Sequence, residues 1–420
     1  MGAAFPKVRS ASPQVRVSFH PVKSRIPIAL SILSIAAILF FTLRPAGTET
    51  HGWSFTLTSG DAALAELLQN IILFVPLGVS LTLAGLWPQR VILAGGLLSF
   101  TVEFLQQWIP GRDPSVGDIV SNTIGTAVGV LLVVTAPMWL WAPPRRSAWH
   151  ALGTAGAAVA IWSGTGALLR PIYAEPPYYD SWTPDTDHQG HYAGTVLSAT
   201  LGPLPLAPDT ISRDDPALPR SLIMTGQPLR ITAIAPNQPP ARRVTLVAIG
   251  DTIDQEMLLL GADGTDLVLH YSMLALRARL EQPDLRWRHG LARIAPHDTF
   301  TVQTWRDERG VCLGINSTTR CGFGYTLGDG WKLIYFPDQF PRWALGALNA
   351  LWVAGWLAAI GFWSARSGDS AVRYAAAGLA IAGLLLIPTL TQLHPTPLLD
   401  WGGAAIGSAL GYWLGLDDIP

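Results

Sequence analysis

Apolar residues gather into eight segments along the chain, separated by short polar links and by one long polar stretch. A helix that crosses a membrane needs about 20 mostly apolar residues, and each segment has that length or comes close to it. The last segment is one of the two shortest and is rich in glycine. The pattern predicts about eight transmembrane helices, at residues 26–43, 63–86, 91–109, 116–141, 149–169, 343–363, 371–391 and 399–416.

The long polar stretch, residues 170–342, has a different pattern. Short runs of alternating apolar and polar residues follow one another there, and Asp, Gly, Pro and Asn separate them. This spacing, without a helical period, predicts a β-sandwich, with one hairpin turning at Asp263 and Gly264. The order of the runs resembles a concanavalin A-like (laminin-G-like) jelly roll. The runs are residues 242–250, 266–274, 275–280, 299–307, 311–317 and 331–337.

The composition agrees with a membrane protein that carries one soluble domain. The chain is 49% hydrophobic and 14% charged, whereas soluble domains average about 25% charged residues. We therefore predict a polytopic α-helical membrane protein with an all-β extracytoplasmic domain. Its parts are a basic tail at 1–25, a membrane domain of five spans at 26–169, the β-sandwich at 170–342 and three further spans at 343–420.

The distribution of Lys and Arg predicts the orientation. With eight spans, most basic residues of the tail and short loops fall on one side, whereas the opposite loops hold only Arg44 and Arg112. Cytoplasmic loops carry the excess of positive charge, so both termini are predicted to be cytoplasmic and residues 170–342 periplasmic, in a bacterial inner membrane. The net charge of −1, without a basic stripe, argues against a nucleic-acid partner. The basic residues are Lys7, Arg9, Arg16, Lys23, Arg25, Arg90, Arg145, Arg146, Arg366 and Arg373.

Cys312 and Cys321 are the only cysteines, and both lie in the predicted periplasmic stretch. Eight residues with turn formers separate them, so a hairpin brings them within disulfide range. An even pair in an oxidising compartment predicts a disulfide, and two unpaired strand cysteines are the alternative. No cofactor is expected and no metal spacing of Cys and His is present. A metal site near residues 185–191 (Asp185, Asp187, His188 and His191) is weaker than a polar loop.

A small set of polar residues interrupts the second, third and fourth spans. Such side chains are costly within a membrane, which points to a function or to pairing among themselves. Glu103 and Gln107 are four residues apart, as are Asp118 and Asn122, so each pair shares a helix face. The predicted orientation places the whole set near the outer side of the membrane. The set is Asn70, Glu103, Gln106, Gln107, Arg112, Asp118 and Asn122.

The order and spacing of these residues resemble the VanZ-like family of bacterial membrane proteins. Members share an Asn before a Phe-x-Pro-x-Gly, Glu and Gln at the end of one span, a following Arg, and an Asp-x-x-x-Asn-x-x-Gly that opens the next span. The resemblance implies a cell-envelope role, because VanZ-like proteins are linked to resistance to teicoplanin-type glycopeptides. The matching residues are Asn70, Phe74, Pro76, Gly78, Glu103, Gln107, Arg112, Asp118, Asn122 and Gly125.

The sequence of the last spans is similar to that of the first ones. Asn349 lies about as far into its span as Asn70 does, and the stretch from Gln392 to Gly407 is similar to the stretch around Asp118. We therefore expect two VanZ-like four-helix halves, the second formed by the fifth to eighth spans, with the β-sandwich as an insertion. The echo aligns Asp400 with Asp118, Gly403 with Asn122 and Gly407 near Gly125. Chance likeness of spans rich in glycine and alanine is the alternative.

Three interpretations of the polar set remain open. It is a purely structural cluster in which Arg112 neutralises a carboxylate, a cavity for a polar or anionic headgroup, or a catalytic site with Glu103 and Asp118 as acid and base. We expect a non-enzymatic binding protein whose ligand residues are Asn70, Glu103, Gln107, Arg112, Asp118 and Asn122. The expected partners are a membrane lipid or lipid-linked envelope precursor, and a glycan or envelope protein at the β-sandwich. An enzyme acting on an envelope lipid and a transporter are the alternatives.

Overall fold

The computed structural model describes residues 25–45, 47, 52–54, 60–173, 175, 177–184, 190–208, 210–211, 217–251, 256–336 and 340–416. The chain forms two compact units, described separately below. The first unit contains Met1–Leu57 and Leu67–Pro137, and the second contains Thr58–Glu66 and Met138–Pro420.

Four helices build the first unit: α1 (Ile26–Thr42), α2 (Ala63–Leu83), α3 (Pro88–Gln106) and α4 (Val116–Trp139). Proline at the start of α1 and α3 suits the first turn of a helix, where a backbone N–H has no partner within the helix. A small apolar core joins α1, α2 and α3. Its buried residues are Ile38, Phe74, Leu77 and Val102.

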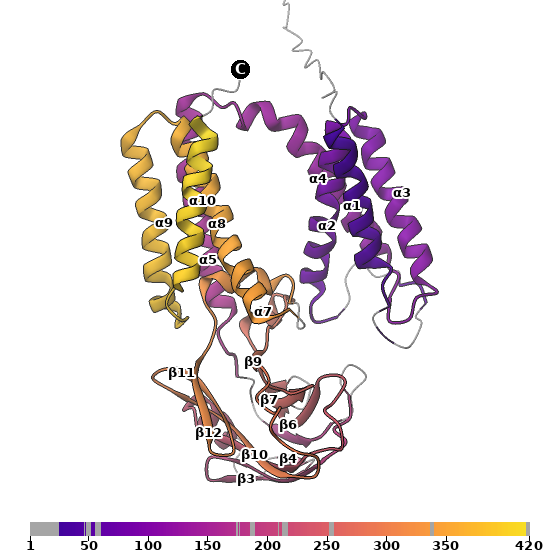
Figure 1. Cartoon of the computed structure of the whole chain (residues 1–420), viewed down its shortest axis with the longest axis vertical. Coiled ribbons are helices and arrows are strands. Elements are labelled where there is room, and N and C mark those ends of the chain that lie inside the picture. Colours follow the sequence, from indigo (N-terminus) through magenta and orange to yellow (C-terminus); the bar gives the residue numbers. More distant parts are fainter. Residues whose placement is uncertain are drawn as a thin grey trace, which may run out of the picture. The chain divides into compact units, whose positions relative to one another are not determined.

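The second unit contains four more long helices: α5 (Pro144–Leu168), α8 (Arg342–Arg366), α9 (Ser370–Thr391) and α10 (Leu398–Leu416). α5 packs against α8 and α9, and α8 packs along α10, the orange and yellow helices of Figure 1. Small residues make this packing close: an added Cβ on Gly403, Gly407 or Gly411 of α10 would lie within 3.0 Å of the α8 backbone. Small residues at helix contacts are typical of membrane helices, since they let backbones approach.

Among the described residues, five helices are long and apolar enough to cross a membrane, namely α2, α4, α5, α8 and α9. α1 is a shorter apolar helix of 17 residues. All eight predicted segments are helical within a few residues of the expected limits. Spanning by several helices is therefore supported, whereas spanning by α1, α3 and α10 stays a prediction.

The remainder of the second unit is a β-sandwich of two six-stranded antiparallel sheets (Figure 1). One sheet has the order β4-β1-β6-β7-β8-β9 and the other β12-β11-β10-β5-β2-β3. The strands are β1 (Tyr178–Trp182), β2 (Thr195–Leu201), β3 (Leu204–Leu206), β4 (Thr210–Ile211), β5 (Leu229–Ile234), β6 (Val244–Asp251), β7 (Glu256–Asp263), β8 (Asp266–Tyr271), β9 (Leu285–Trp287), β10 (Thr299–Asp307), β11 (Gly310–Ile315) and β12 (Thr318–Phe323).

Alternating burial builds the core between the two sheets. In β10 the buried side chains are Phe300, Val302 and Thr304, every second residue of the strand. The core is continuous across both sheets, which confirms the predicted β-sandwich. The finer expectation of a concanavalin A-like jelly roll stays a prediction. The turn between β7 and β8 lies where it was expected, with Gly264 in the left-handed region at φ +57°.

Two of the predicted strands are wrong. Residues 275–277 belong to a single helical turn, α7 (Leu274–Arg277), that follows β8, and residues 278–279 form a turn after it. Residues 331–337 begin inside a 3₁₀ helix, η1 (Leu327–Leu333), because Thr326 and Asp329 form a capping box that starts this helix. A further short helix, α6 (Leu218–Met224), precedes β5.

Candidate functional site

Asn70 and Asp118 join two helices of the first unit. Asn70 lies on α2 and Asp118 lies in the first turn of α4, where the helix dipole favours a carboxylate. Asn70 Nδ2 donates a hydrogen bond of 2.7 Å to Asp118 Oδ1. The helices come this close because Gly125 has no side chain at the place where α4 meets Ile71 of α2. The structure thus brings together two residues that the sequence placed in one site.

Ser115, immediately before α4, links Glu103 to the Asn70–Asp118 pair through hydrogen bonds. The Glu103 carboxylate accepts a hydrogen bond of 2.9 Å from the backbone N–H of Ser115. Ser115 Oγ in turn accepts one of 3.0 Å from the backbone N–H of Asp118, so Ser115 caps the helix. Glu103 is only 2% exposed, and it lies close enough to Asp118 for their charges to interact.

Asn122 lies one turn further along α4 and faces α3. Its Nδ2 donates a hydrogen bond of 2.9 Å to Ser99 Oγ. The side chain is 1% exposed, and its carbonyl oxygen Oδ1 has no hydrogen-bond partner among the described residues. A buried polar atom without a partner is costly, so the place suits a water molecule or a donor group of a ligand.

Arg112 and Gln107 lie differently from the prediction. Arg112 donates to the backbone carbonyls of Phe41 at 2.7 Å and Arg44 at 2.9 Å, at the C-terminal end of α1. Burial lowers the pKa of Arg112 from its usual value, and the nearby Glu103 charge opposes that shift. Among the described residues Arg112 therefore stabilises a helix end instead of forming an ion pair with a carboxylate.

Gln107 turns away from the polar cluster. Its amide donates to the carbonyl of Phe104 in its own helix at 3.1 Å. The neighbouring Gln106 is the buried glutamine, and it donates to the carbonyl of Thr42 at 3.0 Å. Gln107 is the C-cap of α3, and its amide bonds back to the last turn of that helix, so the buried amide at this helix end is that of Gln106.

Residues 12–139 match the family model VanZ/LLP1. The match contains α1–α4 and with them every residue of the cluster just described. No curated protein and no solved structure matches the chain significantly. We call α1–α4 the VanZ-like region below.

A second polar cluster lies in the second unit, between the β-sandwich and the helices. Asn349 of α8 donates 2.9 Å to Asp329 Oδ1 of η1, and Lys332 forms an ion pair of 2.5 Å with the same oxygen. Burial acts to raise the pKa of Asp329, but Lys332 and the surrounding hydrogen bonds lower it overall. Asp400 of α10 lies beside this group, is 2% exposed, and has an Oδ2 atom without a partner among the described residues.

The sequence missed the contribution of Asp329 and Lys332. Both belong to or border a run that was predicted as a strand, so no role was expected for them. The signal was present, because Thr326 and Asp329 have the spacing of a capping box.

The glycine contacts give the two bundles a common register. Gly125 meets Ile71, one residue after Asn70, and Gly403 meets Ala350, one residue after Asn349. In this register Gly403 corresponds to Gly125. Asp400, three residues before Gly403, then corresponds to Asn122 and not to Asp118. This register differs by about one helical turn from the alignment that the sequence suggested, and the repeat of small residues at i and i+4 allows both registers.

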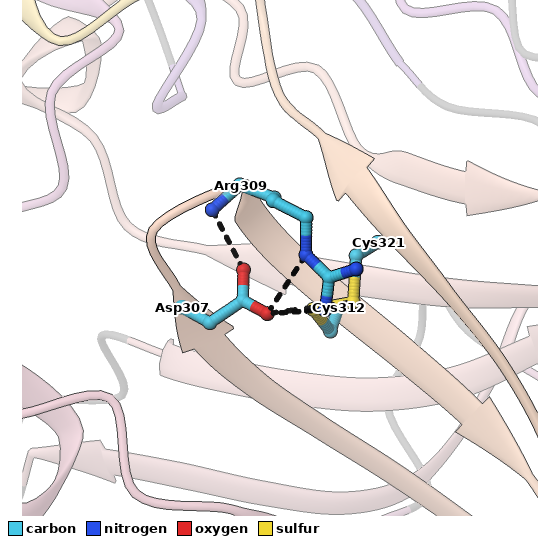
Figure 2. The surroundings of a disulfide bond; sticks show 4 residues. All are labelled: Asp307, Arg309, Cys312 and Cys321. Carbon is cyan, nitrogen blue, oxygen red and sulfur yellow. Dashed lines mark hydrogen bonds and ion pairs between the residues drawn. A yellow bond between two sulfur atoms is a disulfide. The ribbon is translucent and has the colours of Figure 1, made fainter.

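Cys312 and Cys321 form the predicted disulfide. They are direct partners on the hairpin of β11 and β12, with Cα atoms 4.0 Å apart. Asp307 and Arg309 lie beside the bond, and Figure 2 shows the Asp307 carboxylate accepting hydrogen bonds from the Arg309 backbone and guanidinium.

Candidate metal ligands remain without support. The carboxylate of Asp307 and the two sulfurs lie within 4.8 Å of one another, but the sulfurs are bonded together and offer no thiolate ligand. Of the weak metal candidate near residues 185–191, Asp185, Asp187 and His188 lie outside the described residues.

Proposed function

We propose that this protein is a multi-pass membrane protein of the bacterial cell envelope whose VanZ-like region binds the polar headgroup of an envelope lipid or lipid-linked precursor. The observation that carries the proposal is the polar cluster of Asn70, Glu103, Asp118 and Asn122, in which Glu103 and Asn122 are buried and Asn122 Oδ1 has no partner among the described residues. The link of VanZ-like proteins to teicoplanin-type resistance suggests a ligand from cell-wall synthesis.

A purely structural cluster explains this arrangement less well. Buried polar atoms in native proteins nearly always have at least one hydrogen-bond partner. The carbonyl oxygen of Asn122 is buried but has no hydrogen-bond partner among the described residues. A hydroxyl or amine of a headgroup supplies the missing donor. Asn70 and Asp118 hold each other in place, which preorganises the site.

The proposed topology places both termini in the cytoplasm and residues 170–342 in the periplasm. The Lys and Arg distribution supports this orientation. The disulfide of the β-sandwich supports it independently, because such bonds persist in oxidising compartments. In this position we expect the β-sandwich to engage a glycan or another envelope protein.

Native mass spectrometry of the full chain tests the headgroup proposal. Lipids that co-purify with the wild-type protein are compared with those of Glu103→Gln and Asn122→Ala. Thr101→Val is the matched control, because its hydroxyl bonds only to the carbonyl of Leu97 in the same helix. We expect a bound lipid species to be lost from the first two variants and kept in the control. Retention of the same lipids by all three variants, each folded, would refute the proposal.

An enzyme acting on an envelope lipid is the second candidate. The observation that favours it is the electrostatic contact between the buried Glu103 and Asp118, since paired carboxylates can act as acid and base. If Glu103→Gln keeps the lipid bound but accumulates it unprocessed, the enzyme is favoured over the binding protein.

We also propose that α5, α8, α9 and α10 are a second, diverged copy of the VanZ-like region. Two matching contacts support this origin. Gly125 and Gly403 each pack against the residue that follows an asparagine in the neighbouring helix. The β-sandwich is then an insertion between the first and second helices of that copy.

A further inference from the structure

A cavity of about 390 Å³ lies in the second unit where the β-sandwich meets the ends of α5 and α9. Two hydrogen bonds join the β-sandwich and the helix ends around this cavity. The backbone N–H of His394, after α9, donates 2.8 Å to the carbonyl of Tyr325, and Arg170, after α5, donates 3.0 Å to the carbonyl of Leu390. Both helices are long and apolar enough to cross a membrane. The cavity therefore lies at the level where two such helices end.

One wall of the cavity is cationic and phenolic. Arg306 at the end of β10 lies close to Tyr173 and Tyr271: burial raises the pKa of both phenols, and the Arg306 charge acts to lower it. The one side-chain partner of Arg306 among the described residues is Gln392 Oε1, at 3.4 Å. Its guanidinium thus keeps most of its five donors for a ligand.

The acidic residues of the rim do not neutralise this wall. Asp307 accepts hydrogen bonds from the backbone and guanidinium of Arg309, as Figure 2 shows, and is therefore already paired. Glu308 is exposed at the edge of the cavity. Arg170 and His394 add further donors to the same space.

Two glycines hold His394 against the sheet. Gly310 has φ +107°, and an added Cβ there would lie 3.0 Å from the His394 ring, while one at Gly324 would lie closer still. The lining also contains apolar side chains, which suit the first carbons of an acyl or prenyl chain. Its residues are Leu169, Ile223, Leu258, Leu269, Phe323 and Leu393.

We propose that this cavity binds a phosphate-bearing ligand, with the phosphate at Arg306 and the phenol of Tyr173. Arginine matches phosphate oxygens in a bidentate geometry, and hydrogen bonds that involve charged groups are about twice as strong as neutral ones. The volume lies within the usual range of ligand pockets, roughly 300–1,000 Å³. This site belongs to the second unit and does not depend on the function proposed for the VanZ-like region.

Binding measurements on the full chain in detergent test this site with two probes. Phosphatidylglycerol represents a lipid phosphate, with phosphatidylcholine for comparison, and glycerol 3-phosphate represents a free one. The variants are Arg306→Gln and Tyr173→Phe, and Arg293→Gln is the matched control, because Arg293 is an exposed arginine of the same sandwich outside the cavity.

For the probe that binds, we expect Arg306→Gln to raise Kd roughly ten- to hundredfold, Tyr173→Phe to raise it less, and Arg293→Gln to leave it unchanged. If Arg306→Gln weakens binding of phosphatidylglycerol alone, the ligand is a lipid phosphate. If it weakens binding of glycerol 3-phosphate, the ligand is a free phosphate. Equal affinity of wild type, Arg306→Gln and Arg293→Gln for both probes overturns the proposal, as does the absence of binding to the wild type.

Discussion

Gly407→Ala tests the close contact between α8 and α10 on which the second bundle rests. An added Cβ would lie 2.8 Å from Ala354 Cα, whereas ordinary contacts begin at 3.4 Å, so the two helices must separate by more than half an ångström. Overpacking of this kind costs roughly 1–3 kcal/mol. Alanine also gains about 0.5–1 kcal/mol over glycine within a helix, because it has less backbone entropy to lose.

Gly402→Ala in the same helix isolates the packing term, because nothing lies within 4 Å of the added Cβ. It receives the helix gain alone, so the difference between the two variants is the overpacking cost. Thermal unfolding of the detergent-solubilised chain, followed by tryptophan fluorescence, measures both. We expect Gly407→Ala to unfold several degrees below Gly402→Ala. If Gly407→Ala unfolds at the same temperature as Gly402→Ala or above it, the close contact between α8 and α10 does not exist.

Four further predictions concern separate parts of the chain. Arg112→Ala should destabilise the protein by about 1–3 kcal/mol, since the end of α1 loses its donors, whereas exposed Arg90→Ala should not; equal thermal unfolding of both contradicts this role. Burial raises the pKa of Asp180 in β1 from 3.8 to about 6. The folded chain therefore favours the protonated carboxyl, and the stability that Asp180 contributes is full below about pH 4. This stability falls by up to about 3 kcal/mol as the pH rises to 6. Asp180→Asn should therefore stabilise the chain at pH 7.5 and change little at pH 4, and equal effects at both pH values refute the reasoning. Replacing Cys312 and Cys321 by serine should cost roughly 2–3 kcal/mol in unfolding free energy, and thiol labelling of the wild type without reductant should find neither residue reactive. Reporter fusions should place the C terminus in the cytoplasm and residue Arg293 in the periplasm; a periplasmic C terminus contradicts the eight-span topology.

The positions of the long helices could be predicted from the sequence because the requirement is simple. A segment of about 20 apolar residues satisfies its backbone within itself, so composition alone finds it. The hairpin disulfide was predictable for a similar reason, since Cys312 and Cys321 are close in sequence and separated by turn formers. Several strands gave no such signal. β1 and β2 have polar or small residues at half of their positions, and their burial comes from partners far along the chain.

Side-chain partners within the polar cluster were only partly predictable. The pairing of Asn70 with Asp118 follows from helix order and depth, and the structure contains it. The role of Arg112 does not follow, because the acceptors are backbone carbonyls of α1, and carbonyls carry no sequence signal. A partly buried arginine does not require a carboxylate partner. It can instead donate to the carbonyls at the C-terminal end of a helix, where the helix dipole also favours a cation.

The two asparagines of corresponding position show how the proposed copies have diverged. In the VanZ-like region the carboxylate bonded to Asn70 comes from α4 of the same bundle. In the second bundle the carboxylate bonded to Asn349 is Asp329, which the end of the β-sandwich region supplies, together with its cation Lys332. In the proposed duplication, the inserted domain supplies a contact that the bundle makes by itself in the first copy. A contact of this kind fixes the β-sandwich to its own helices, and it occupies the asparagine that the first copy keeps within its polar cluster. We expect for this reason that the headgroup site of the protein is the VanZ-like one, while the second bundle serves to anchor the periplasmic domain.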